Sequence, residues 1–129
     1  MILAIDPGSE KCGLAILGQD ARVSHKNIVP TAEISDEVAA LLTKHTVEMI
    51  VIGQGAFGRA LEKRLLEAAV KSNFTFIPEN DSSWQARQRY WQEHPPAGWL
   101  RFIPTSLRVP PVPVDDYAAV IIGERYLKS

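Results

Sequence analysis

Three short segments of strand length, separated by tight turns, open the sequence, and they restrict the fold more than any other feature does. Residues 2–6 and 13–17 are apolar, and residues 22–28 follow a turn and have the length of a strand. The connections between them, centred on residues 7–9 and 18–20, are too short for a crossover. We therefore predict that the chain begins with an antiparallel meander of three neighbouring strands.

Helices and strands alternate after the meander. We predict helices at 35–44 (capped by Ser35), 59–71, 82–92 and 115–127, and strands at 47–52 and 74–77. The inward-facing positions of the 59–71 helix are predicted to be Leu61, Leu65, Ala68 and Ala69. A meander followed by strand–helix units indicates an α/β fold, in which helices flank one mixed sheet of five strands.

Length and composition set broad limits on the class of protein. A chain of 129 residues is predicted to be a single domain, and 46% hydrophobic residues are too many for a disordered chain. No apolar run approaches the roughly 18 residues that a membrane helix needs, and no signal peptide is visible, so we expect no membrane partner. The single cysteine, Cys12, excludes an intramolecular disulfide and favours a cytoplasmic location.

Charge and aromatic residues are concentrated in one segment. The net charge of −1 excludes a globally basic nucleic-acid binder, but residues 82–114 hold four arginines, a single acid and all three tryptophans. Arginines interleaved with aromatic residues suit contact with phosphates and stacking on bases. The alternative, an aromatic core beneath solvated arginines, stays open. The candidate contacts in this segment are Trp84, Arg87, Arg89, Arg101 and Arg108.

Carboxylates fall where predicted strands and helices meet. Asp6 ends the first strand, Glu79 follows the 74–77 strand, and Asp115 and Asp116 open the final helix. Strand ends that share one edge of a sheet form a crevice in which sites collect. Oxygen ligands alone favour Mg²⁺ or Mn²⁺, and two such ions about 4 Å apart suit in-line attack of water on a phosphodiester.

Each carboxylate also has an ordinary structural interpretation. Asp6 precedes a turn, Glu79 suits a solvated loop, and Asp115 suits a helix N-cap with Asp116 in the first turn. Helical spacing favours Asp115 over Asp116 as the residue that points to the sheet, because Asp115 shares a stripe with small and apolar residues. That stripe contains Ala118, Ala119 and Ile122.

Four motifs, in order along nearly the whole chain, resemble a known family. The run IDPGSEKCGLA (residues 5–15) is similar to the first-strand motif of the RuvC/YqgF branch of RNase H-like nucleases. Residues 51–53 are similar to its central strand and following loop, and residues 79–86 to its second acidic motif. Residues 115–119 are similar to its C-terminal motif. The length resembles the compact YqgF type more than the longer RuvC type.

The resemblance implies an RNase H-like fold and a divalent-metal nuclease that cleaves structured nucleic acid. The YqgF type is associated with maturation of 16S rRNA, and the RuvC type with resolution of Holliday junctions, which requires a homodimer. Residue by residue it implies that Asp6, Glu79 and Asp115 are the catalytic, metal-binding carboxylates, with Asp116 as a candidate extra ligand. The sequence departs from the YqgF pattern at Asn80, where an arginine is common.

Two other functions remain alternatives. Residues 53–58 read G-x-G-x-x-G, and Glu79 follows near the position of a ribose-binding acid, which is the pattern of a dinucleotide site. That fingerprint normally opens its domain, whereas here a meander precedes it. Within the nuclease hypothesis, Gly55 and Arg59 are candidates for contact with a substrate phosphate. The other alternative is an RNase H-like module that binds nucleic acid without cleaving it.

Overall fold

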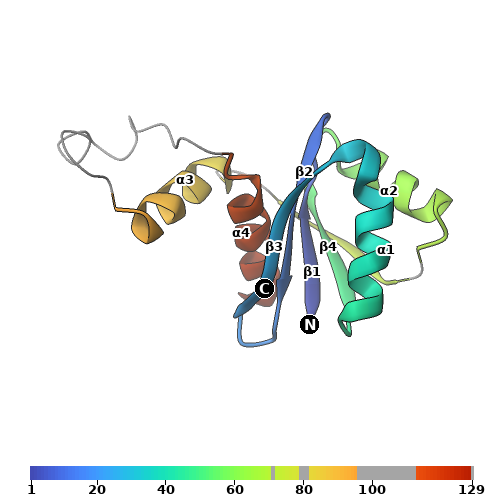
Figure 1. The fold of residues 1–129 in the computed structure, drawn as a ribbon, viewed down its shortest axis with the longest axis horizontal. Helices are drawn as coiled ribbons and strands as arrows, with labels where there is room; N and C mark the ends of the chain where they lie inside the picture. The colour runs from blue at the N-terminus through green and yellow to red at the C-terminus, as the bar shows by residue number, and fades with distance from the viewer. Residues whose placement is uncertain (71, 79–81, 96–112, 129) are drawn as a thin grey trace.

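The computed structural model describes residues 1–70, 72–78, 82–95 and 113–128. Its five strands form one mixed sheet in the order β3-β2-β1-β4-β5 (Figure 1). The strands are β1 (Ile2–Asp6), β2 (Lys11–Leu17), β3 (Val23–Pro30), β4 (Met49–Gln54) and β5 (Phe74–Pro78). β1 to β3 are antiparallel, whereas β4 and β5 run parallel to β1. The predicted meander and the mixed five-stranded sheet are confirmed.

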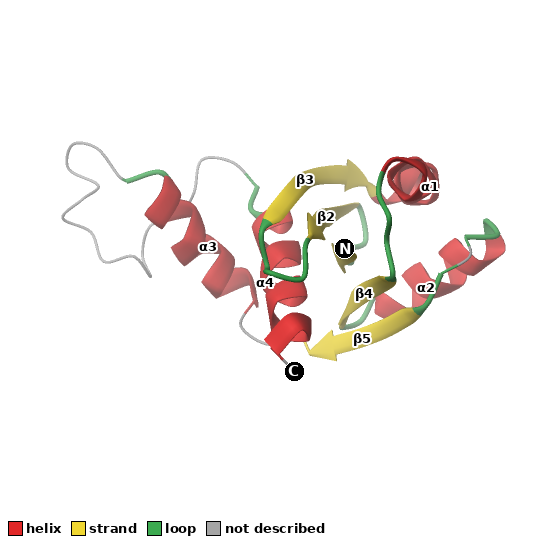
Figure 2. Cartoon of the chain, turned by 90° about the horizontal axis from the view of Figure 1, so that it is seen from below, coloured by secondary structure: helices red, strands yellow, loops and turns green. Residues whose placement is uncertain are grey.

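Helices cover both faces of this sheet. α1 (Ile34–Lys44) and α2 (Gly58–Glu67) lie on one face, and α4 (Asp115–Lys128) lies on the other (Figure 2). α3 (Ser82–Glu93) packs against α4, on the side that faces away from the sheet. From one side to the other, the layers are therefore α1 with α2, the sheet, α4 and α3.

Strand alternation divides the core into two halves. On β1, Leu3 and Ile5 belong to the core beneath α1 and α2, whereas Ile2 and Ala4 belong to the core beneath α4. Successive side chains of a strand point to opposite faces, so Asp6 continues the set that faces α4. The first strand thus delivers a carboxylate to the α4 side of the sheet.

The end of α2 differs from the prediction. The helix stops at Glu67 rather than at residue 71, and Ala68 and Ala69 are exposed rather than inward-facing. Ala69 adopts a left-handed conformation (φ 58°), and two backbone hydrogen bonds, Val70 N to Leu65 O and Ala69 N to Leu66 O, close the helix. This is a Schellman ending, in which buried Val70 packs back toward the helix.

The start of α1 also differs. Ser35 was predicted as the cap, but the helix begins at Ile34 and follows directly from a 3-10 turn over Thr31–Glu33. Glu33 occupies the cap position and its side chain makes no capping hydrogen bond. The turn has already bent the backbone into a helical path, so a side-chain cap at Ser35 has no role. Other element boundaries differ from the predictions by a few residues at most.

Candidate active site

Asp6 and Gly13 lie directly opposite one another on β1 and β2. Residues paired across an antiparallel ladder point to the same face, so Gly13 also faces α4. Gly13 carries no side chain, which leaves room above the sheet beside the Asp6 carboxylate.

The first turn of α4 fills that room. A Cβ atom at Gly13 would overlap the carbonyl carbon and oxygen of Asp115 and would lie 2.9 Å from the nitrogen of Asp116. The backbone of the helix thus rests on the strand at this position, and only glycine permits so close an approach. Because Asp6 is paired with Gly13, this contact brings the backbone of Asp115 close to the strand position that carries Asp6.

The carboxylate of Asp115 is held without a hydrogen bond. Its Oδ2 atom is buried and accepts no hydrogen bond, although the side chain as a whole is 31% exposed. The first backbone hydrogen bond of α4 runs from Ala118 N to Val114 O, so Val114 rather than Asp115 is at the cap position. The helix-cap interpretation of Asp115 therefore does not account for its carboxylate. A buried, unsatisfied carboxylate oxygen is costly unless a cation is near.

Lys11 supplies the nearest positive charge. Its Nζ atom lies 3.4 Å from Asp115 Oδ2, which is an ion pair without the alignment of a hydrogen bond. Lys11 and Gly13 are two residues apart on β2, so both project to the α4 face. In the sequence, Lys11 stands out only as part of the motif at residues 5–15. The signal that could have found it is this two-residue spacing from Gly13.

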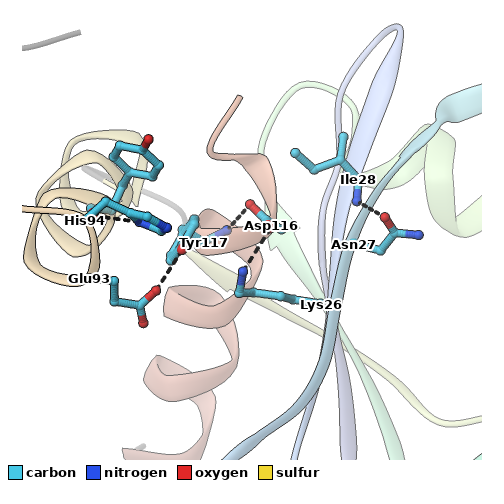
Figure 3. A network of polar contacts seen from close by, with 8 residues as sticks. Lys26, Asn27, Ile28, Glu93, His94, Asp116 and Tyr117 are labelled. Carbon is cyan, nitrogen blue, oxygen red and sulfur yellow. Dashed lines mark hydrogen bonds and ion pairs between the residues drawn. The ribbon is translucent and has the colours of Figure 1, made fainter. Parts of the chain in front are cut away.

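Asp116 points to a different partner (Figure 3). Lys26 of β3 lies 3.4 Å from its Oδ2 atom, and its Oδ1 atom accepts a hydrogen bond from the Tyr117 nitrogen at 2.9 Å. The Lys26 ammonium also lies 4.4 Å from the centre of the Tyr117 ring. Asp116 is therefore engaged in a contact between β3 and α4, and it reaches the sheet although helical spacing favoured Asp115 alone.

Tyr117 connects this contact to α3. Its hydroxyl donates a 2.7 Å hydrogen bond to Glu93, as Figure 3 shows. Burial, followed by the hydrogen bond to Glu93 and by the negative charges of Glu93 and Asp116, raises the pKa of Tyr117 well above its ordinary value. The phenol is therefore a neutral donor at physiological pH.

Three predicted site residues, Glu79, Arg101 and Arg108, lie outside the described residues. The strand that leads to Glu79 ends at Pro78, whose carbonyl accepts a 2.8 Å hydrogen bond from Arg125 Nη1. Arg125 is near the C-terminal end of α4, about 15 Å along the helix from Asp115 at 1.5 Å per residue. Within the described ranges, no group of three or more His, Cys, Asp or Glu side chains is placed to hold a metal ion. Asp6 and Asp115, whose positions both adjoin Gly13, are a pair and not such a group.

The predicted contacts on α3 divide into two kinds. Trp84 is 47% exposed and Arg87 is exposed, so both are available to a ligand. Arg89 instead forms a 2.7 Å ion pair with Glu124 of α4. The N-terminal end of α3 is fixed near the C-terminal end of α4, where Gln85 accepts a hydrogen bond from Arg125. Trp84 therefore lies toward the end of α4 remote from Asp115.

The glycine-rich loop between β4 and α2 has a packing explanation. A Cβ atom at Gly58 would lie 2.7 Å from the carbonyl oxygen of Gly53 and 3.4 Å from the Phe76 ring. Gly58 therefore lets the loop turn back closely on β4. Gly55 is exposed. The Arg59 guanidinium lies 4.2 Å from the centre of the Phe76 ring and 3.6 Å from a carboxylate oxygen of Glu62.

In the described part of the chain, no helix has the length and apolarity that crossing a membrane requires.

Comparison with known proteins gives matches in structure but not in sequence. No protein-family model matches the chain, and no curated protein sequence matches it. RuvC of Thermus thermophilus superposes with a TM-score of 0.55 at 16% identity, over 97% of this chain and 93% of that one. T. thermophilus RuvC in complex with a Holliday junction substrate gives 0.52 at 17% identity, over 94% and 88%. The chain therefore has the RuvC-like form of the RNase H fold.

Proposed function

We propose that this chain is a divalent-metal-dependent nuclease that hydrolyses phosphodiester bonds of structured nucleic acid. The proposal is supported above all by two observations: the first turn of α4 rests on Gly13, the ladder partner of Asp6, and Asp115 Oδ2 is buried without a hydrogen bond. A RuvC-like fold over nearly the whole chain supports it. The proposal treats residues 1–129 as one cytoplasmic RNase H-like domain.

The donor set fits a hard divalent cation. Asp6 and Asp115 supply only oxygen ligands, which Mg²⁺ and Mn²⁺ prefer to the nitrogen and sulfur ligands of zinc. A cation at this position would also satisfy Asp115 Oδ2. We propose that Asp6 and Asp115 hold the metal, that Glu79 completes the set, and that Asp116 remains with Lys26 as a support. Two bound ions would activate the attacking water and stabilise the leaving oxygen.

The remaining residues of the chain position this pair. Gly13 fixes the height of the first turn of α4 above β2, and the Asp116–Lys26 ion pair fixes the turn against β3. Trp84 and Arg87 on α3 are proposed contacts for substrate farther from the reaction centre. Gly55, Arg59, Arg101 and Arg108 stay candidate contacts, whereas Arg89 is proposed to join α3 to α4.

The class of nucleic acid has two candidates. The T. thermophilus RuvC structure contains a Holliday junction, which favours branched DNA. The motif resemblance to the YqgF type favours a structured rRNA precursor. Symmetric cleavage of a junction needs a homodimer, whereas trimming of RNA does not. The substrate and the oligomeric state are therefore tested together.

A cleavage panel tests the function. It contains a four-way DNA junction, duplex DNA, single-stranded RNA and a structured rRNA precursor, each with Mg²⁺ or Mn²⁺. The enzymes are the wild type and Asp6→Asn, and Asp20→Asn is the matched control, because Asp20 lies in the exposed turn between β2 and β3. We expect metal-dependent cleavage of a branched or structured substrate by the wild type and the control, and a loss of at least about 1,000-fold in Asp6→Asn.

The panel also separates the alternatives. Tight binding in both Mg²⁺ and EDTA without cleavage by any enzyme would favour the non-catalytic module and contradict the proposal. Saturable binding of NAD that Gly55→Val abolishes would favour the dinucleotide site instead. The length of the product and the strand that is cut then distinguish a resolvase from an RNA-processing enzyme.

A further inference from the structure

Two lysines on neighbouring strands each neutralise one carboxylate in the first turn of α4. Lys11 on β2 pairs with Asp115, and Lys26 on β3 pairs with Asp116, both at 3.4 Å. Lys26 and Ala15 are partners across the ladder, so Lys26 projects to the same sheet face as Lys11. The two pairs look equivalent by distance alone, but their surroundings differ.

The Lys26–Asp116 ion pair is partly buried and supported by neighbouring groups. Asp116 is 15% exposed and its second oxygen already accepts the Tyr117 N–H, while the lysine also lies over the Tyr117 ring. Each residue of this pair therefore has a second interaction. A partly buried pair with such support is a fixed structural contact.

Within the part of the chain that the structure describes, the Lys11–Asp115 ion pair lacks such support, and its lysine is exposed to solvent. Lys11 is 50% exposed, and Asp115 Oδ2 accepts no hydrogen bond even though the ammonium is 3.4 Å away. No other interaction of Lys11 is found among the described residues. Half-exposed ion pairs of this kind contribute little stability and are easily exchanged for a stronger partner. A divalent cation, with twice the charge, is such a partner for Asp115.

We propose that Lys11 is a positioning residue that occupies the Asp115 side of the site until a divalent cation displaces it, and that the released ammonium then binds a phosphate oxygen of the substrate strand. This inference rests on the proposed function. Lys11 begins β2 and is connected to Asp6 by the short 7–10 turn, so its ammonium stays at the edge of the site after release. The exchange keeps the positive charge beside the phosphate that the carboxylates would otherwise repel.

Binding of Mn²⁺ without nucleic acid tests the first half of the inference. Isothermal titration is carried out on the wild type, Lys11→Met, Lys11→Arg and, as the matched control, Lys26→Met. Methionine keeps an unbranched apolar stem, and far-UV circular dichroism checks that each variant is folded. We expect Lys11→Met to bind Mn²⁺ roughly two- to five-fold more tightly, because no ammonium competes. Lys11→Arg should restore the wild-type affinity, and Lys26→Met should show no such gain.

Binding of nucleic acid in Ca²⁺, used here as a probe cation for measuring affinity, tests the second half. The substrate is the one that the cleavage panel identifies, labelled with a fluorophore and titrated at several salt concentrations. We expect Lys11→Met to bind more weakly and to lower the salt slope by about one ion, whereas Lys26→Met leaves the slope unchanged. In EDTA, where Lys11 remains on Asp115, the slopes of wild type and Lys11→Met should coincide.

The outcomes separate this inference from the function on which it rests. Equal Mn²⁺ affinity in the wild type and Lys11→Met would overturn the displacement of Lys11 while leaving the nuclease intact. An unchanged salt slope in Ca²⁺ would overturn its contact with phosphate. A wild type that binds no Mn²⁺ would contradict the metal-dependent function itself, and the inference would fall with it.

Discussion

The two sides of α4 make contacts of opposite kinds. On the sheet side, small residues bring the backbone close: Ala119 is fully buried, and the first turn rests on Gly13. On the α3 side, aromatic rings fill the interface, where Tyr117 of α4 meets Tyr90 edge-to-face with the ring centres 6.1 Å apart. The sheet side is therefore fixed by backbone contact, whereas the α3 side is joined by side chains.

This difference explains where the acidic pair lies. A carboxylate that must hold a metal ion has to be positioned to within a fraction of an ångström. Backbone-to-backbone contact at Gly13 provides that precision for Asp115. The α3 side is secured by an exposed carboxylate, Glu93, and a partly exposed ion pair, Arg89–Glu124, so it tolerates more variation. We expect substitutions on the two sides to differ accordingly.

Gly13→Ala should have the largest effect. The added methyl group has no free space, so the first turn of α4 must move away from β2, and we expect a loss of about 3 kcal/mol in the free energy of unfolding. A displacement of about 1 Å should also lower cleavage about 100-fold. Urea denaturation and cleavage of the panel substrate measure the two effects.

Gly123→Ala is the matched control on the same side of the same helix. Its new Cβ atom would lie 2.8 Å from Cδ1 of the buried Leu17 side chain and 3.2 Å from the Cβ atom of Ala4, so it meets side chains of the core rather than backbone. Alanine also favours the helix by about 1 kcal/mol over glycine. The crowding and the helix preference oppose one another, so we expect a loss of at most about 1 kcal/mol in stability. A loss as large as that of Gly13→Ala would refute the special role of Gly13.

Tyr117→Phe tests the α3 side. The variant loses one hydrogen bond to Glu93, an exposed carboxylate that water can solvate, so we expect a loss of about 1 kcal/mol in stability. Cleavage should fall much less than in Gly13→Ala. A cleavage defect equal to that of Gly13→Ala would show that both sides of α4 position the site, and the comparison would fail.

The same tyrosine predicts a pH dependence. Its pKa is raised in the folded state, so the folded protein keeps a proton that the unfolded chain releases above about pH 10. The stability that the raised pKa of Tyr117 contributes is therefore fully present below that pH, and it is lost as the pH rises further. Thermal melts between pH 9 and about 11 should show a steeper fall for the wild type than for Tyr117→Phe.

Ala69→Gly should have the smallest effect and touches neither side of α4. Ala69 ends α2 in a left-handed conformation that glycine adopts without steric cost, so we expect a gain of about 0.5 to 1 kcal/mol in stability. Cleavage should not change. Chemical denaturation measures the gain, and a loss of stability would mean that α2 ends differently.

Local patterns in the sequence predicted much of the fold and part of the site. The strand-length segments and short turns predicted the meander. Helical phase favoured Asp115 over Asp116 as the residue that faces the sheet, whereas both aspartates pair with lysines of the sheet. Contacts between distant segments could not be predicted in this way. The role of Gly13 depends on a helix about a hundred residues later, and no local pattern reveals that proximity.

Other misses have local physical causes. Ala69 adopts a left-handed conformation, which is uncommon for alanine. The helical pattern of the sequence continues through this residue, so it did not predict that α2 ends at Glu67. Ser35 fitted the composition of a cap, but the preceding 3-10 turn had already begun the helix. The two lysine–aspartate pairs follow from strand register, which became definite only with the sheet.

Location of bound Mn²⁺ by anomalous diffraction tests the central claim most directly. Crystals of the wild type soaked in Mn²⁺ should show an anomalous peak at about 2.1 to 2.3 Å from carboxylate oxygens of both Asp6 and Asp115. Asp6→Asn crystals treated in the same way should lose or weaken that peak. Mn²⁺ bound elsewhere, with none between these two carboxylates in the wild type, would contradict the account.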